Sequence, residues 1–123
     1  MREGSPTVLV VDDDPDLRAL LTAVLDAQGI QVLTARNGME GFALACLHRP
    51  ALIVLDLEMP VMTGEDFRRV QLDADVIQQI PVLVLSARDD ASRVAERLNA
   101  VAFLAKPVDV ERFLNCVRPY TAA

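Results

Sequence analysis

The chain contains few of the residues that mark the commonest metal, redox and membrane proteins. Its two cysteines, Cys46 and Cys116, stand alone, at no spacing typical of a metal or redox site. No apolar run approaches the length that a membrane-spanning helix needs, and residues 1–6 lack the apolar centre of a signal peptide. We therefore expect a cytoplasmic protein with reduced thiols and no membrane partner.

Basic residues are also scarce. The 123 residues include 12 basic and 18 acidic side chains, a net charge of −6. This balance argues against nucleic acid or an anionic membrane surface as a direct partner. All the basic residues except Lys106 are arginines, so the position of this single lysine is of interest.

Apolar residues are plentiful at 52% of the chain, enough to bury the core of one domain. Five short apolar runs recur at nearly even intervals, over residues 7–12, 31–35, 51–56, 81–86 and 101–105. The first, third and fourth are almost wholly apolar and rich in Val, Leu and Ile, which is typical of strands covered on both faces. The other two are shorter or more polar, as edge strands can be.

Helical periodicity fills the intervals between these runs. Asp14 and Asp109 are placed to cap the first and last helices, and Gly29 is placed to end the first. The strict alternation predicts an α/β fold, a (βα)5 doubly wound parallel sheet with helices on both faces. We expect a single domain over residues 1–123, with its core at about 7–118 and no output domain in this chain.

The apolar stripe of the second helix is marked by Met39, Phe42, Ala43, Cys46 and Leu47, which predicts that this face is buried. The third helix has the least regular pattern of the five. The third is expected over roughly residues 65–76, with Arg68 and Arg69 on a solvated face.

Polar side chains stand at the carboxyl ends of four of the expected strands. In open α/β sheets, ligands bind beyond these ends, near the point where the strand order reverses. Taken singly, each residue is ordinary for a helix cap or a turn. Their convergence on one edge instead indicates a functional site. The residues are Asp12, Asp13, Asp56, Ser86 and Lys106.

Such an acidic cluster needs a compensating cation. Two carboxylates about 4 Å apart repel by roughly 4 kcal/mol at an effective dielectric constant near 20. Oxygen ligands of this kind suit Mg²⁺ or Mn²⁺, and a nearby ammonium can neutralise further charge. A carboxylate not fully committed to the metal could act as a nucleophile, so the chemistry that fits is phosphoryl transfer to an aspartate.

Four motifs carry a resemblance that covers nearly the whole chain. They are "VVDDDP", "IVLDLEMPVMTG", "VLVLSA" and "FLAKP". Together, in this order and spacing, they resemble the receiver domain of bacterial two-component response regulators. The resemblance implies a flavodoxin-like fold with strand order 2-1-3-4-5.

The resemblance also implies roles for individual residues. Asp56 would accept the phosphoryl group from a phosphohistidine. Asp12, Asp13 and Asp56 would hold Mg²⁺ together with the backbone carbonyl of Glu58, and Mn²⁺ could substitute. Lys106 would pair with the phosphoryl oxygens.

Further positions would belong to the switch and its surroundings. The hydroxyl of Ser86 would turn toward the phosphate, and Phe103 would swing inward on phosphorylation. The bond before Pro107 is expected to be cis. Glu58 and Arg88 flank the cleft and could set the lifetime of the phosphate.

The implied function is that of a signalling switch rather than an enzyme. Its partners would be a sensor histidine kinase or phosphotransfer protein and a downstream protein that reads the surface of helix four, strand five and helix five. Homodimerisation on phosphorylation is a further option, and the chain could stand alone or belong to a longer protein.

Two alternative functions are a metal-dependent phosphatase with an aspartyl-phosphate intermediate and a pseudo-receiver that only binds partners. Glu58 stands where such phosphatases carry an acidic Asp.

Overall fold

The computed structural model describes residues 6–122. Residues 1–5 and 123 lie outside the described part, and so does most of the segment considered for a signal peptide. The elements alternate along the chain in this order: β1 (Thr7–Val11), α1 (Pro15–Ala27), β2 (Gln31–Ala35), α2 (Gly38–His48), β3 (Leu52–Asp56), α3 (Gly64–Leu72), β4 (Val82–Ser86), α4 (Ala91–Arg97), β5 (Ala102–Ala105) and α5 (Val110–Thr121). None of these helices is long and apolar enough to cross a membrane.

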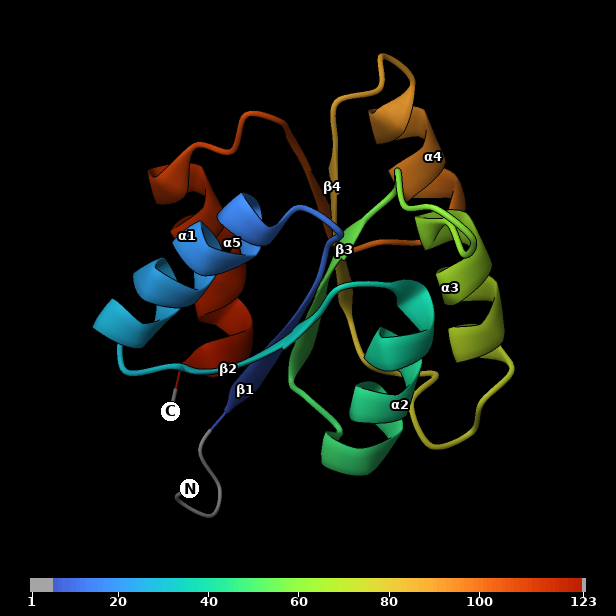
Figure 1. Ribbon diagram of the computed structural model, residues 1–123, viewed down its shortest axis with the longest axis horizontal. Coiled ribbons are helices and arrows are strands. Elements are labelled where there is room, and N and C mark those ends of the chain that lie inside the picture. Colours follow the sequence, from blue (N-terminus) through green and yellow to red (C-terminus); the bar gives the residue numbers. More distant parts are fainter. Residues whose placement is uncertain (1–5, 123) are drawn as a thin grey trace.

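The strands form one parallel sheet in the order β2-β1-β3-β4-β5. Helices α1 and α5 cover one face, and α2, α3 and α4 cover the other (Figure 1). The predicted doubly wound α/β fold is confirmed. All five strands end at the same edge, which is the edge where the polar residues were expected to gather.

Alternate residues of the central strands supply two apolar layers. Leu9, Ile53 and Val84 belong to the layer beneath α2, α3 and α4. Val10 and Val54 belong to the layer beneath α1 and α5. Because both faces are covered, these strands carry apolar side chains at every position except their ends, as the sequence predicted.

The local signals in the sequence predicted the strands and several helix ends closely. Each strand lies within one residue of its expected bounds. Asp14 accepts a hydrogen bond from the backbone N–H of Asp16 at 2.9 Å and caps α1, and Asp109 caps α5 in the same way. After α1, Gly29 adopts a φ of 75°, a conformation that side chains other than glycine rarely take.

The expected buried face of α2 is confirmed only in part: Phe42 and Cys46 pack against the core, but both ends of the predicted stripe are exposed. Met39 and Leu47 are 66% and 75% exposed, whereas the small residues Gly41 and Ala45 face the sheet. A Cβ atom at Gly41 would lie only 2.8 Å from a methyl group of Val11. The helix therefore packs close to β1 through small side chains, and this approach leaves the larger apolar ones outside.

Helix α3 also differs from the expectation. It ends at Leu72 instead of continuing to about residue 76. The side chain of Gln71 turns back and donates to the carbonyls of Ile77 and Ile80 at 3.0 and 2.9 Å, which stabilises a run of turns after the helix.

The expectation of a solvated Arg68 is wrong as well. This side chain is only 5% exposed, and it donates to the carbonyls of Leu98 and Asn99 at the end of α4, at 3.0 and 3.2 Å. Arg68 thus connects α3 to α4. Arg69, its neighbour, is exposed as predicted.

Candidate functional site

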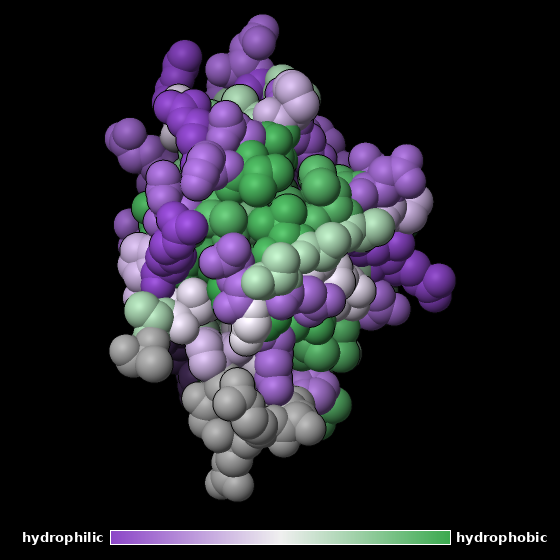
Figure 2. Space-filling model, turned by 90° about the vertical axis from the view of Figure 1, so that its left-hand side faces the viewer, coloured by the Kyte–Doolittle hydropathy of each residue, from purple (hydrophilic) through white to green (hydrophobic). Residues whose placement is uncertain are grey.

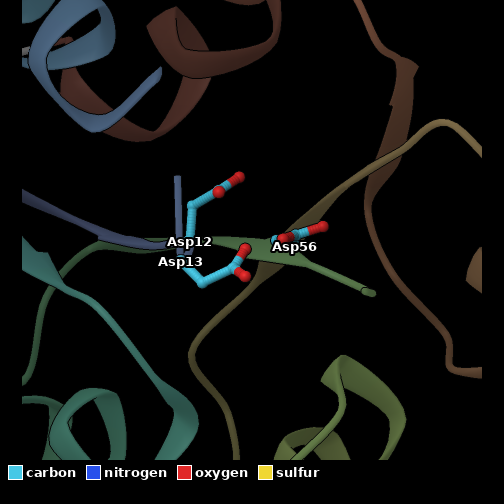
Figure 3. A group of neighbouring side chains, drawn as sticks. All are labelled: Asp12, Asp13 and Asp56. Atoms are coloured by element: carbon cyan, nitrogen blue, oxygen red, sulfur yellow. The ribbon is translucent and has the colours of Figure 1, made fainter. Parts of the chain in front are cut away.

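Three carboxylates meet at the carboxyl edge of the sheet. Asp12 and Asp13 follow β1, and Asp56 is the last residue of the adjacent strand β3 (Figure 3). Their nearest oxygens all lie within 4.8 Å of one another. Asp12 and Asp56 are fully buried, whereas Asp13 is exposed. The parallel pairing of Val11 with Leu55 places the strand ends side by side and so brings the carboxylates together.

Lys106, the residue that follows the edge strand β5, completes this cluster. Its ammonium nitrogen lies 3.2 Å from Asp12 Oδ2 and 3.1 Å from Asp56 Oδ1. The backbone N–H of Lys106 donates to the carbonyl of Ser86 at 3.0 Å, which fixes the start of its loop. The peptide bond between Lys106 and Pro107 is cis. The single lysine therefore lies where two buried negative charges need it.

The charges in the cluster shift one another's protonation. Burial, followed by repulsion from Asp12, raises the pKa of Asp56 to about 7, although Lys106 and the Glu58 N–H act in the opposite direction. Burial pulls the pKa of Lys106 down, but the Asp12 and Asp56 carboxylates outweigh it and hold that pKa above its ordinary value. Asp56 thus exchanges its proton near neutral pH, while Lys106 keeps its charge.

Two buried oxygens of the cluster lack a hydrogen-bond donor among the described residues: Asp12 Oδ2, which faces the Lys106 ammonium at 3.2 Å, and Asp56 Oδ2. Asp56 Oδ2 is buried and accepts no hydrogen bond from any residue that the structure describes. Its other oxygen accepts the backbone N–H of Glu58 at 3.1 Å and faces Lys106. A buried oxygen without a donor is costly unless a cation or another ligand binds it. Clustered carboxylate oxygens fit Mg²⁺ or Mn²⁺, so the donor set suits the expected metal.

Glycine makes room for this arrangement at the start of α3. A Cβ atom at Gly64 would lie 2.6 Å from the carbonyl oxygen of Asp56. The backbone N–H of Gly64 donates to the carbonyl of Leu57 at 3.1 Å. The close approach packs the loop that follows Asp56 tightly against the end of β3.

Ser86, the last residue of β4, is buried beside the cluster but is already engaged. Its hydroxyl donates to Glu58 Oε2, and the backbone N–H of Ala87 donates to Glu58 Oε1 at 3.2 Å. The sequence places Glu58 at the rim of the cleft but does not reveal this contact. Only the spacing of two residues after Asp56 marked the position.

The remaining predicted residues lie near the site without touching the carboxylates in any contact found among residues 6–122. Phe103 lies on β5, paired with Val84, and packs against the apolar layer beneath α4. Arg88 forms ion pairs with Glu65 at 3.1 Å and Asp90 at 3.0 Å. It therefore holds the loop after β4 against the start of α3.

The fold and the site define an α/β protein with an acidic, lysine-containing site at the carboxyl edge of a doubly wound sheet. Residues 8–118 match the family model described as "Response regulator receiver domain". The chain belongs to this family, as the motifs predicted. Its membership is consistent with two-component signalling.

Known proteins of similar length agree with this assignment. The chain is 36% identical to protein PilH of Pseudomonas aeruginosa over 94% of its length and 97% of the relative's. It is 30% identical to the polar-differentiation response regulator DivK of Brucella anthropi, with 93% and 94% covered.

Solved structures show the same fold. The chemotaxis protein CheY4 of Vibrio cholerae superposes with a TM-score of 0.86 at 28% identity, covering 95% of this chain and 99% of the other. A response regulator receiver protein of Pseudomonas putida gives 0.85 at 30% identity, with 96% and 99% covered.

Proposed function

We propose that Asp56 accepts a phosphoryl group from a phosphohistidine on a sensor histidine kinase or phosphotransfer protein. The observation that carries this proposal is the buried Oδ2 atom of Asp56, which has no hydrogen-bond partner among residues 6–122, while Oδ1 of the same carboxylate faces Lys106 at 3.1 Å. A carboxylate with one restrained oxygen and one oxygen without a donor is suited to nucleophilic attack.

The transfer would proceed by in-line displacement. Asp56 Oδ2 attacks phosphorus, the new O–P bond forms, and the P–N bond to the imidazole breaks. The electron pair of that bond goes to the imidazole nitrogen, and the ring, which has taken a proton from solvent on its other nitrogen, leaves as neutral imidazole. Asp56 must be deprotonated to attack, and the Lys106 ammonium favours that form. The same ammonium lies close enough to stabilise the charge on the transferred oxygens.

The proposed cofactor is Mg²⁺, for which Mn²⁺ could substitute. Asp12, Asp13 and Asp56 would hold it with their carboxylates, and Glu58 with its backbone carbonyl. When bound, the ion neutralises charge that develops on the phosphoryl oxygens.

The phosphorylated chain would act as a signalling switch rather than as an enzyme. The phosphoryl group on Asp56 would carry nearly two negative charges where the carboxylate carries one, and the hydroxyl of Ser86 can turn toward them. The loop after β4 would follow, Phe103 would move inward, and the surface of α4, β5 and α5 would change for a downstream protein or a second copy of the chain. We place this switch in the cytoplasm, where the free thiols of Cys46 and Cys116 stay reduced.

A groove next to Lys106 suits the docking of the phosphodonor. Figure 2 shows apolar side chains gathered on the face where α1 and α5 lie. A groove of about 320 Å³ on that side is lined by Leu17, Leu20 and Val108 together with Lys106. An apolar partner surface seated there would lie next to the acidic cluster.

Intact-mass measurement tests the proposal. Incubation with acetyl phosphate and Mg²⁺ should add one phosphoryl group, about 80 Da, to the chain. Asp56→Asn should abolish the gain, whereas Asp89→Asn, an exposed change on the loop after β4, should leave it intact. Equal labelling of the Asp56→Asn variant would show that another residue is the acceptor.

A further inference from the structure

The loop that follows β4 is held at its first residues by one carboxylate. Ser86 donates its hydroxyl proton to Glu58 Oε2, and the backbone N–H of Ala87 donates to Glu58 Oε1 at 3.2 Å. The Ser86 oxygen in turn accepts the backbone N–H of Arg88 at 3.0 Å. A single side chain from the loop after β3 therefore accepts one hydrogen bond from the last residue of β4 and one from the first residue of the loop that follows it.

This arrangement uses a proton that the phosphoryl group would need. A hydroxyl has one proton to donate, so Ser86 cannot donate to Glu58 and to a phosphoryl oxygen at the same time. Asp56 pairs with Leu85 across the adjacent strands. Ser86 is therefore the residue that follows the direct cross-strand partner of Asp56. The two acceptors of the Ser86 proton thus lie close together, at the end of β3 and in the loop that follows it.

We infer that Glu58 is a positioning residue that restrains Ser86 and thereby limits the phosphorylation of Asp56. The inference rests on the proposed function, because Glu58 acts only through the hydroxyl that would bind the phosphoryl group. Glu58 is exposed, and its side chain gains no partner from an arginine or lysine among the described residues. Its carboxylate accepts instead from the Ser86 hydroxyl and the Ala87 N–H.

The consequence is a competition between two anions for one loop. Before phosphate arrives, the Glu58 carboxylate occupies the Ser86 hydroxyl and the Ala87 N–H. For Ser86 to stabilise the transferred oxygens, the hydrogen bond to Glu58 must break. The loop remains tethered at Arg88, which pairs with Glu65 and Asp90, so its first residues can turn while the rest stays near α3.

Glu58→Gln tests the inference, since the amide keeps the size of the side chain but loses its charge and one acceptor oxygen. We expect its initial rate of phosphorylation by acetyl phosphate with Mg²⁺ to rise about three- to tenfold, the equivalent of one net hydrogen bond. The melting temperature, measured alongside, checks that the fold is retained.

A second background separates this effect from a general change in charge near an anionic donor. In Ser86→Ala, the Glu58→Gln change should no longer raise the rate, because the hydroxyl that it releases is gone. Asp89→Asn, which removes one negative charge from the same loop, should not reproduce the increase. As a direct readout, the Ala87 amide resonance of unphosphorylated Glu58→Gln should move toward the position that it takes in the wild-type protein with bound beryllofluoride.

Each outcome distinguishes the inference from the proposed function. An equal increase with and without the Ser86 hydroxyl, or no increase in Glu58→Gln while Asp56 is still phosphorylated, would overturn the role of Glu58 and leave Asp56 as the acceptor. If neither the wild-type protein nor any variant takes up phosphate, the proposed function is wrong, and the inference is wrong with it.

Discussion

At the scale of single residues, the acidic cluster balances the unfavourable burial of two carboxylates against the two ion pairs that they form with one lysine. Asp12 and Asp56 are buried side by side, and Lys106 lies between them at 3.2 and 3.1 Å. The sequence predicted this grouping because all three residues stand at strand ends, where the strand order alone decides which side chains are neighbours. It could not predict the Glu58–Ser86 contact, because the reach of a side chain on an irregular loop depends on the packed structure.

Asp56→Asn should stabilise the metal-free protein. In the wild type, the pKa of Asp56 is raised from 3.8 to about 7 on folding, so the folded state keeps a proton that the unfolded state releases. The contribution of Asp56 to stability is therefore greatest below pH 3.8, falls as the pH rises toward 7, and stays low above it. The neutral amide escapes this loss, and we expect a gain of about 1–3 kcal/mol at pH 8.

Thermal denaturation followed by circular dichroism in EDTA, at pH 5 and pH 8, measures this effect. The advantage of Asp56→Asn over wild type should be larger at pH 8. An advantage that is absent at pH 8, or larger at pH 5, would contradict the assigned burial of charge.

Lys106→Gln should destabilise the protein. The change leaves two buried carboxylates without their cation, which for fully buried pairs costs about 3–5 kcal/mol. The Lys106 side chain is 22% exposed, so we expect a smaller loss, about 1–3 kcal/mol at pH 8 without metal. Urea unfolding gives this value, and the loss should shrink at pH 5, where Asp56 takes up a proton. A variant as stable as wild type at pH 8 would show that the ion pair contributes nothing.

At the scale of elements, the strands were more predictable than the helices. A strand covered on both faces needs apolar residues throughout, and that pattern is visible in the sequence alone. The buried face of α2 was not visible, because Gly41 and Ala45 are selected by the short distance to β1 rather than by hydrophobicity. The burial of Arg68 was missed for a related reason. A charged side chain can be predicted to be buried only when the groups that accept its hydrogen bonds are known, and here these are carbonyls at the end of α4.

Arg68→Met should loosen the contact between α3 and α4. The methionine fills much of the same volume but donates nothing, which leaves the carbonyls of Leu98 and Asn99 without this donor. We expect a loss of about 1–3 kcal/mol. Arg69→Met, on the exposed neighbour, should change stability by no more than about 0.5 kcal/mol. Urea unfolding of the two variants compares them, and equal stabilities would show that the connection is unimportant.

At the scale of the whole molecule, two apolar layers hold a sheet whose carboxyl edge carries the unfavourable charges. The fold class and the strand order were predictable, since alternating strands and helices of this length leave few other arrangements. The folded state gathers Asp12, Asp13 and Asp56, whereas an unfolded chain separates them. A divalent cation that binds this cluster must therefore stabilise the entire fold.

Mg²⁺ should raise the melting temperature in a concentration-dependent way. Binding to the folded state alone adds about 2.7 kcal/mol when the free ion reaches 100 times its dissociation constant. Asp13→Asn should weaken the effect without harming the metal-free protein, because Asp13 is exposed. A titration followed by differential scanning fluorimetry compares both chains. Identical shifts would exclude Asp13 from the metal site.

The position of Lys106 also makes the acidic edge accessible to chemical labelling. It is the only lysine, so an acylating reagent has one side-chain amine to modify besides the amino terminus. Its reactivity is suppressed while the ammonium is held by Asp12 and Asp56. Occupation of those carboxylates by a competing cation would free the amine. The acylation rate of Lys106, measured by mass spectrometry, would therefore report whether the site is occupied. This readout is useful because the chain has no tryptophan for fluorescence.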